Sequence, residues 1–481
     1  MVTHPWRELT AREPATYDAL TADRRSNPMK PLPILVSLVA LQGVALADTP
    51  VGGTDIGLGE DSQPNAFDAN NPAFGVNPIS IIQGDGVKIG EGTSLYPQVG
   101  LETGYVSNVF YQSSNPIGAG LMRLIVEVGA GSLSMSPARS AVSPEEEATT
   151  PNDKGDFLYS ANLYATYDQY LSGNDAVTSQ GGLGLGAYLR GAVNPGKPLS
   201  FLVINNFDRI IRATNFESQH DTNRDINNLT LQLSYAPAGR SLSGSIHLQN
   251  TIDIFEESDQ GFADRMLTAV GARLNYKFLP LTLVYADVTG DANTGLGNSS
   301  TKVTSYPLVA VLGINTAITL ETSIIGRIGY TEGFFSSGPD YATITGGLYV
   351  EHRYPLGKFD LMYSYDHSDS INANFYRDHL VQAWVEQRFA PFTVFASPML
   401  RLREYEGLVV APMATGSASV RDDVIFAAWA GMRYQFRNWI MASLEYRLTI
   451  DETSFRYMVD GSTQDPSYIR HELLLGVRAA Y

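Results

Sequence analysis

Residues 471–481 read HELLLGVRAAY and end the chain. Every second residue of this stretch is apolar, so an extended strand would place these side chains together on one face. They are Leu473, Leu475, Val477, Ala479 and Tyr481. A strand with one apolar and one mixed face is typical of a transmembrane β-barrel, where alternate residues point to lipid and to the lumen. The stretch therefore predicts a barrel strand.

The same residues resemble the signal that the bacterial barrel-assembly machinery reads on a final strand. That signal ends on an aromatic residue, with a hydrophobic residue two positions earlier and a glycine three positions before that. Gly476, Ala479 and Tyr481 match this pattern, whereas Leu474 stands where a polar residue is usual. The resemblance implies that the barrel-assembly machinery is a partner of this chain and that the bacterial outer membrane is its location.

The two-residue period of the last stretch continues back through the chain to Tyr96. We expect eighteen antiparallel strands in a single all-β transmembrane barrel, with sixteen as the alternative count. They lie near residues 96–106, 119–132, 156–170, 178–192, 198–208, 225–236, 241–255, 264–278, 280–289, 303–315, 317–331, 341–354, 357–367, 376–390, 392–404, 421–436, 438–450 and 467–481.

The links between these segments alternate in length and composition. Short links rich in proline and glycine, such as 236–239 and 355–357, alternate with longer polar links such as 209–224 and 405–420. Outer-membrane barrels have short periplasmic turns and long extracellular loops, and an even strand count places both termini in the periplasm. One periplasmic link departs from this rule, and we expect residues 133–155 to form a disordered insertion.

The start of the chain has the pattern of a targeting segment. Residues 29–47 combine a basic start, an apolar run too short to span a bilayer and an Ala-x-Ala end, which predicts a signal peptide. Residues 1–28 are polar and without periodicity, so we assign them to a start codon placed too far upstream. We expect residues 48–95 to form a largely irregular periplasmic segment before the barrel at 96–481.

Composition excludes several classes of function. The chain has no cysteine, which excludes disulfide scaffolds and thiolate metal sites. Its net charge of −17 argues against a nucleic-acid partner, because phosphate binding needs a cationic face.

Two short segments are candidate metal or catalytic sites. Residues 291–298 offer oxygen ligands at alternate positions but lack the closing glutamate of a calcium loop. Residues 366–369 read DHSD, and without a second carboxylate pair we expect no enzyme, metal or cofactor.

A barrel of this size implies a lumen, because sixteen to eighteen strands leave an aqueous channel. Charged residues on the inward parity are the candidate pore-lining set: Arg353, Arg388, Arg401, Arg403, Arg433, Arg447, Arg478, Glu351, Glu386 and Glu445. Most of these arginines fall on five adjacent strands, and such a wall would guide an anionic solute or polymer. The alternative is that they pair with Glu386 and Glu445 and hold the wall together.

Residues 88–112 read KIGEGTSLYPQVGLETGYVSNVFYQ and resemble the opening of the β-barrel porin type 2 family. The matching residues are Leu95, Pro97, Gly104, Tyr105, Asn108, Val109 and Phe110. Ser107 stands where members of that family usually have aspartate. The resemblance covers this stretch alone. It implies an outer-membrane barrel, and some members resemble the barrels of exopolysaccharide export systems.

Two functions follow as hypotheses. The first is a porin-like conduit that carries polysaccharide or another polar solute, with outer-membrane lipid around it. The second is a non-conducting barrel whose long extracellular loops bind a partner or a glycan.

Overall fold

The computed structural model describes residues 86–89, 92–132, 156–211, 223–256, 264–297, 303–370, 373–407, 420–459 and 462–481. The predicted signal peptide, the segment before it, most of residues 48–95 and the predicted insertion at 133–155 lie outside the described residues.

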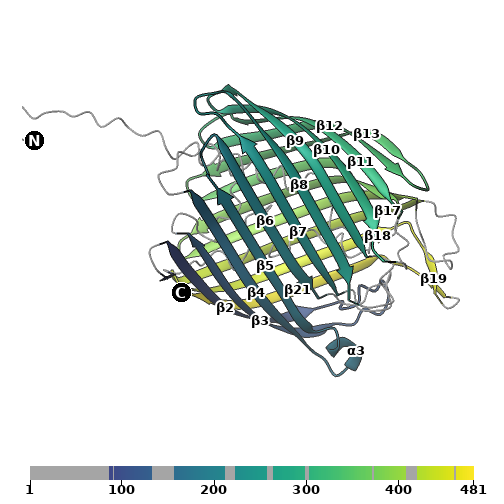
Figure 1. The fold of residues 1–481 in the computed structure, drawn as a ribbon. Helices are drawn as coiled ribbons and strands as arrows, with labels where there is room; N and C mark the ends of the chain where they lie inside the picture. Colours follow the sequence, from purple (N-terminus) through teal and green to yellow (C-terminus); the bar gives the residue numbers. More distant parts are fainter. Residues whose placement is uncertain are drawn as a thin grey trace, which may run out of the picture.

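Eighteen long antiparallel strands form one closed barrel, as the two-residue period predicted (Figure 1). Each strand pairs with its neighbour in the sequence, in the up-and-down order of a meander. The strands are β2 (Thr93–Val106), β3 (Ala119–Ser132), β4 (Phe157–Leu171), β5 (Gly182–Val193), β6 (Leu199–Ile210), β7 (Arg224–Tyr235), β8 (Leu242–Phe255), β9 (Arg265–Leu279), β10 (Thr282–Gly295), β11 (Ser305–Ala317), β12 (Thr322–Phe335), β13 (Tyr341–Tyr354), β14 (Gly357–Asp369), β15 (Phe375–Phe389), β16 (Phe392–Glu406), β17 (Val420–Arg437), β18 (Ile440–Thr453) and β21 (Tyr468–Ala480).

The barrel closes where β2 pairs with β21, from Gln98 opposite Ala480 to Val106 opposite Glu472. The start of β2 extends beyond the end of β21. There the short strand β1 (Val87–Lys88) pairs with β2, with Val87 opposite Leu95. This pairing covers backbone groups that β21 does not reach.

The side chains alternate between a covered inner face and an exposed apolar outer face. On β3, for example, Ile125 and Glu127 are buried, whereas their neighbours Leu124 and Val126 are exposed. The final strand behaves as its sequence predicted, with Leu475 exposed between buried neighbours. The exterior of the barrel is therefore largely apolar, and most of its charged strand residues lie inside.

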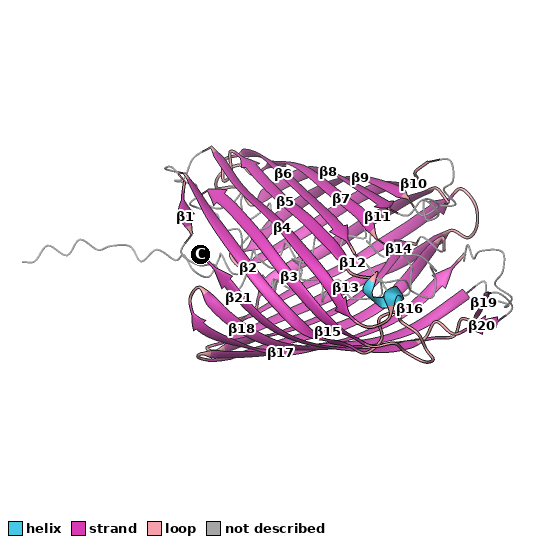
Figure 2. Ribbon diagram, turned by 90° about the horizontal axis from the view of Figure 1, so that it is seen from below, coloured by secondary structure: helices cyan, strands magenta, loops and turns pink. Residues whose placement is uncertain are grey.

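The links differ between the two ends of the barrel, which we call the turn end and the loop end. At the turn end β17 and β18 are joined by Asn438 and Trp439 alone, and the C-terminus lies at this end (Figure 2). The loop end carries the longer links, including α3 (Asp175–Thr178) and a hairpin of β19 (Tyr457–Val459) and β20 (Ser462–Gln464). Among the described residues, none of the helices has the length and the apolar character to cross a bilayer.

The helix α3 explains one error in the predicted boundaries. We expected a strand from residue 178, but β5 begins at Gly182. The Asn174 side chain caps α3 by accepting a hydrogen bond of 3.0 Å from the Ala176 backbone amide. A capping asparagine stabilises the first turn of a helix, so the chain turns once before β5 begins.

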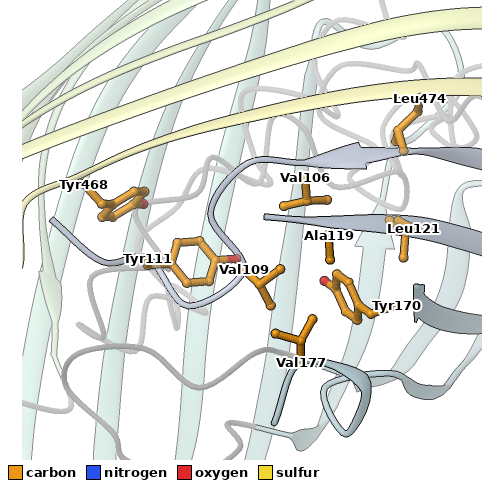
Figure 3. Packing of buried hydrophobic residues seen from close by; sticks show 9 residues of the cluster. All are labelled: Val106, Val109, Tyr111, Ala119, Leu121, Tyr170, Val177, Tyr468 and Leu474. Atoms are coloured by element: carbon orange, nitrogen blue, oxygen red, sulfur yellow. The ribbon is translucent and has the colours of Figure 1, made fainter. Parts of the chain in front are cut away.

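The first link at the loop end, residues 107–118, folds onto the inner side of the strands around the closure. Val109 and Tyr111 pack into a buried cluster with Val106, Ala119, Leu121, Tyr170, Val177, Tyr468 and Leu474 (Figure 3). Tyr111 meets Tyr468 of β21 edge to face at 5.1 Å, so the link contacts the last strand directly.

Asn108 fixes this link to the last strand. Its amide nitrogen donates to the backbone oxygens of Gln112, at 2.8 Å, and Ile469, at 3.2 Å. Its amide oxygen accepts from the Gln112 backbone amide at 2.9 Å. Ser107 and His471 exchange two further hydrogen bonds, of 2.9 Å and 2.8 Å. The asparagine of the motif at 104–110 therefore has a structural role at the closure.

Gly104 of the same motif lies where β2 passes closest to β21. A Cβ at this position would lie 1.9 Å from the backbone oxygen of Leu473, so any side chain requires the strands to separate. We expect Gly104→Ala to destabilise the barrel by about 1–3 kcal/mol, as overpacking does elsewhere. The fraction of folded, heat-modifiable protein on an SDS gel measures this loss.

Gly173 is the matched control for this substitution, because a Cβ there meets nothing within 4 Å. We expect Gly173→Ala to refold as the wild type does. Equal refolding of the two variants would contradict the close approach at the closure.

Candidate functional site

The predicted pore-lining arginines divide into groups along the inner wall. Arg403, Arg433 and Arg478 are buried at 3%, 3% and 5% exposure, and Arg401 and Arg447 are half-buried. Arg353 and Arg388 are exposed near the turn end of their strands, where Arg353 contacts Glu351 and Arg388 donates to Glu386 at 3.2 Å. The set therefore extends from the rim of the barrel to its interior.

Arg401 and Arg403 form the group nearest the loop end, around Asp378 of β15. Arg403 donates to both oxygens of this carboxylate, from Nε at 2.7 Å and from Nη2 at 2.6 Å. Arg401 approaches the same carboxylate at 3.5 Å. The Arg403 guanidinium also lies 3.9 Å from the centre of the Tyr376 ring. The single negative charge of Asp378 therefore offsets only part of the positive charge of Arg401 and Arg403.

Arg478 belongs to a second group, which crosses the closure of the barrel. It pairs with Glu102 of β2, and Arg123 of β3 approaches the same carboxylate at 3.6 Å. Arg123 in turn holds Asp168 of β4 through two hydrogen bonds of 2.6 Å. Charges of alternating sign therefore connect β21, β2, β3 and β4 on the inside of the wall.

A cluster of aromatic rings lies between these two groups of arginines. Trp384 of β15 stacks on Phe395 of β16 at 5.2 Å, and Trp429 of β17 meets both rings edge-on. Trp429 donates from Nε1 to Glu445 at 3.2 Å, and Arg447 lies 3.5 Å from the same carboxylate. The aromatic cluster and its polar rim cover the inner face of four neighbouring strands, β15 to β18.

Arg433 lies at the edge of this aromatic cluster, over Phe395 at 4.1 Å from the ring centre. Every other arginine of the predicted set has a carboxylate within 4.0 Å. In the part of the chain that the structure describes, Arg433 has no hydrogen-bond acceptor for its buried Nε and Nη2 atoms. Arg401, Arg447 and Arg478 also have a buried donor nitrogen without an acceptor, so what distinguishes Arg433 from the rest of the predicted set is that it pairs with no carboxylate in the described part of the chain.

The pairing of most arginines fits the alternative that the sequence left open. Arg388 and Arg447 pair with Glu386 and Glu445, the two residues named for that role. Asp378 and Arg123 were not among the candidates, although both lie on the inward parity of their strands. The parity indicates which residues face inward, but the cross-strand register that joins Arg123 to Asp168 is not visible in one sequence.

In the segment at 366–369, Asp366 forms an ion pair and His367 packs against an aromatic ring. Asp366 accepts from Arg327 at 2.7 Å, and the His367 ring lies 4.9 Å from that of Tyr341. Among the described residues, no group of three or more histidines and carboxylates is arranged to hold a metal ion.

The residues of the predicted assembly signal lie at the end of β21. A Cβ on Gly476 would approach the hydroxyl of Ser443 at 2.8 Å, so this glycine allows a close cross-strand contact. Ala479 pairs with Ile440 and Val99. Tyr481 is 67% exposed and donates its backbone amide to Pro97 at 3.0 Å. Their recognition by the assembly machinery stays a prediction.

Comparison with known proteins gives similarity at the level of solved structures. No family model and no curated protein matches the chain. The outer membrane protein OpdK of Pseudomonas aeruginosa has 9% identity and a TM-score of 0.43, over 80% of this chain and 99% of its own. OccK2 (OpdF) of the same organism, in complex with glucuronate, has 10% identity and a TM-score of 0.40, over 80% and 98%. The FrpB iron transporter of Neisseria meningitidis has 9% identity and a TM-score of 0.40, over 84% and 83%.

The location of the protein follows from its own surface. A closed barrel satisfies every strand edge, and an apolar exterior around a polar interior is the form in which β-proteins cross a bilayer. Exposed apolar side chains cover the outside of this closed barrel. The protein is a bacterial outer-membrane β-barrel.

The group around Asp378 gives a test of the wall. Asp378→Asn removes the carboxylate that Arg401 and Arg403 share, and takes from the buried Arg403 guanidinium the negative charge that accepts its Nε and Nη2 hydrogen bonds. Breaking a buried pair in this way costs about 3–5 kcal/mol. We expect a lower urea midpoint for unfolding in lipid vesicles.

The matched control is Asp156→Asn at the turn end. Asp156 pairs with Lys197, but its side chain is 77% exposed. Exposed pairs contribute about 0–1 kcal/mol, so this variant should unfold near the wild-type midpoint. If Asp378→Asn also unfolded at the wild-type urea midpoint, the stability of the barrel would not depend on the Asp378 carboxylate.

Proposed function

We propose that the protein is a passive channel that carries small polar solutes across the outer membrane through its lumen. The observation that carries this proposal is the distribution of polarity. Charged and amide side chains take the inward positions of the closed barrel, as Asp287, Gln382 and Asp451 do. A barrel of this strand count leaves an aqueous passage when its inner wall is polar.

The charge pairs suggest what kind of solute the wall accepts. Where an arginine is held by a carboxylate, as Arg403 is by Asp378 and Arg478 is by Glu102, the wall offers hydrogen bonds with little net charge. Such a surface accommodates polar solutes of either charge. We propose that the inward arginines and glutamates of the predicted set line this passage, and we assign the protein no enzymatic step.

Conductance tests the proposal directly. The full chain, refolded and inserted in a planar bilayer, should give discrete conductance steps, and vesicles that contain it should swell in a sugar solution. Wild-type protein that has not been refolded, added to the same lipid, is the control and should give neither signal. Folded wild-type protein without conductance or swelling would contradict the channel.

The resemblance at residues 88–112 supports a finer version, in which the solute is an exopolysaccharide on its way to the cell surface. A deletion strain would then lose surface polysaccharide, whereas a strain that loses only the uptake of small solutes would contradict export.

The alternative is a non-conducting barrel that binds a partner or a glycan at its loop end. The ordered link of residues 107–118, packed on the inner side of β2, β3 and β21, is the observation in its favour. It predicts a folded protein without conductance and with loss of function when the loops are shortened.

A further inference from the structure

Several arginines in this barrel hold a carboxylate through the Nε–Nη2 edge of the guanidinium. Arg123 donates from these two atoms to Asp168 at 2.6 Å and 2.6 Å. Arg403 donates from the same atoms to Asp378 at 2.7 Å and 2.6 Å. Two parallel bonds of this kind match the geometry of a carboxylate and are stronger than neutral hydrogen bonds.

Arg433 presents the same edge without an acceptor. Its Nε and Nη2 atoms are buried and have no hydrogen-bond partner in the described part of the chain. Glu445 and Glu386 act on it electrostatically, but each already has a nearer cation. Arg447 lies 3.5 Å from Glu445, and Arg388 lies 3.2 Å from Glu386. Burying a guanidinium whose donors have no acceptor costs free energy. A ligand that accepts hydrogen bonds from these donors would recover part of that free energy.

The aromatic cluster holds Arg433 in this position. The guanidinium lies over the Phe395 ring at 4.1 Å, and Phe395 is itself stacked with Trp384 at an interplanar angle of 11°. A planar guanidinium on a fixed ring keeps its donor edge in one plane, which lowers the entropy lost on binding. Trp384 adds a third buried donor without an acceptor, its indole Nε1. Three buried donor atoms without an acceptor, two of Arg433 and one of Trp384, therefore lie beside the Phe395 ring.

We propose that Arg433 is the carboxylate-binding residue of the channel and that its Nε–Nη2 edge takes the carboxylate of a small organic acid. This inference rests on the proposed channel, because the acid reaches the edge from the lumen. It names one class of solute within the polar solutes that the wall accommodates. The edge is screened from bulk water, which strengthens a charged hydrogen bond there.

A binding titration tests the site without any need for conduction. Full-length refolded protein in detergent is titrated with sodium gluconate, with sorbitol as the uncharged counterpart and sodium chloride to hold the ionic strength constant. Calorimetry and the fluorescence of Trp384 and Trp429, beside Arg433, report binding. We expect saturable binding of gluconate and none of sorbitol. Absence of gluconate binding to the wild type would overturn the proposal.

Two substitutions at the site separate charge from geometry. Arg433→Gln should weaken gluconate binding by about tenfold to a hundredfold, the effect expected for a charge-assisted bidentate contact. Arg433→Lys keeps the charge but loses the planar fork, so we expect an intermediate loss. Heat-modifiable migration confirms that each variant is folded. Wild-type binding in folded Arg433→Gln would overturn the proposal.

Arg388→Gln is the matched control. It removes one positive charge from β15, two strands away from Arg433, but its side chain is 69% exposed and already pairs with Glu386. We expect its gluconate affinity to stay within about twofold of the wild type, because exposed charges are screened. If Arg388→Gln and Arg433→Gln lost gluconate affinity equally, the loss would be a general effect of the removed charge. That result would overturn the proposal that gluconate binds at the Nε–Nη2 edge of Arg433.

The two proposals fail in different ways. A barrel that binds gluconate at Arg433 without conducting overturns the channel and leaves the binding edge in place. A barrel that conducts but does not bind gluconate overturns the binding edge and leaves the channel in place.

Discussion

The pairing of β2 with β21 is the constraint on which the rest of the structure depends. A bilayer offers no water to unpaired backbone groups, so a sheet can cross it only when its first and last strands meet. The register from Gln98 to Val106 supplies this closure. Gly104 permits the close approach, and Asn108 ties the first loop to the backbone of Ile469. The family-like motif of the opening therefore has a physical reason to contain a glycine and an asparagine at these positions.

Closure also decides where the charges lie. Once the exterior faces lipid, most ionisable strand residues point inward, and there neighbouring strands bring charges of opposite sign together. Arg123, Glu102 and Arg478 show this across the closure itself. The inner wall is consequently polar but largely paired. Arg433 departs from that rule, since an aromatic ring holds it instead of a carboxylate. We therefore infer the selectivity of the channel for carboxylates from the position of Arg433. The number of arginines in the wall is not the basis of this inference.

The period of the sequence predicted most of the fold. Alternation needs only the parity of each residue, so the strand count, the inward faces and short links such as the one predicted at 355–357 could be predicted from one sequence. Contacts between strands could not, because a register links residues that no local pattern connects. The pairing of Arg123 with Asp168, a separation of 45 residues, is one example. The docking of Tyr111 on Tyr468 is another, since loops carry no period.

The absence of cysteine from the chain allows the central claim, a water-filled lumen inside a lipid-facing barrel, to be measured directly. Thr166 and Leu163 lie on opposite faces of β4, and Leu163 is 61% exposed on the outside. Thr166→Cys and Leu163→Cys would be treated in intact outer membranes with a charged, water-soluble thiol reagent. We predict rapid labelling of the inward cysteine and none of the outward one. An inward cysteine that stays unlabelled would contradict an open lumen, and a labelled outward cysteine would contradict the orientation of the strands.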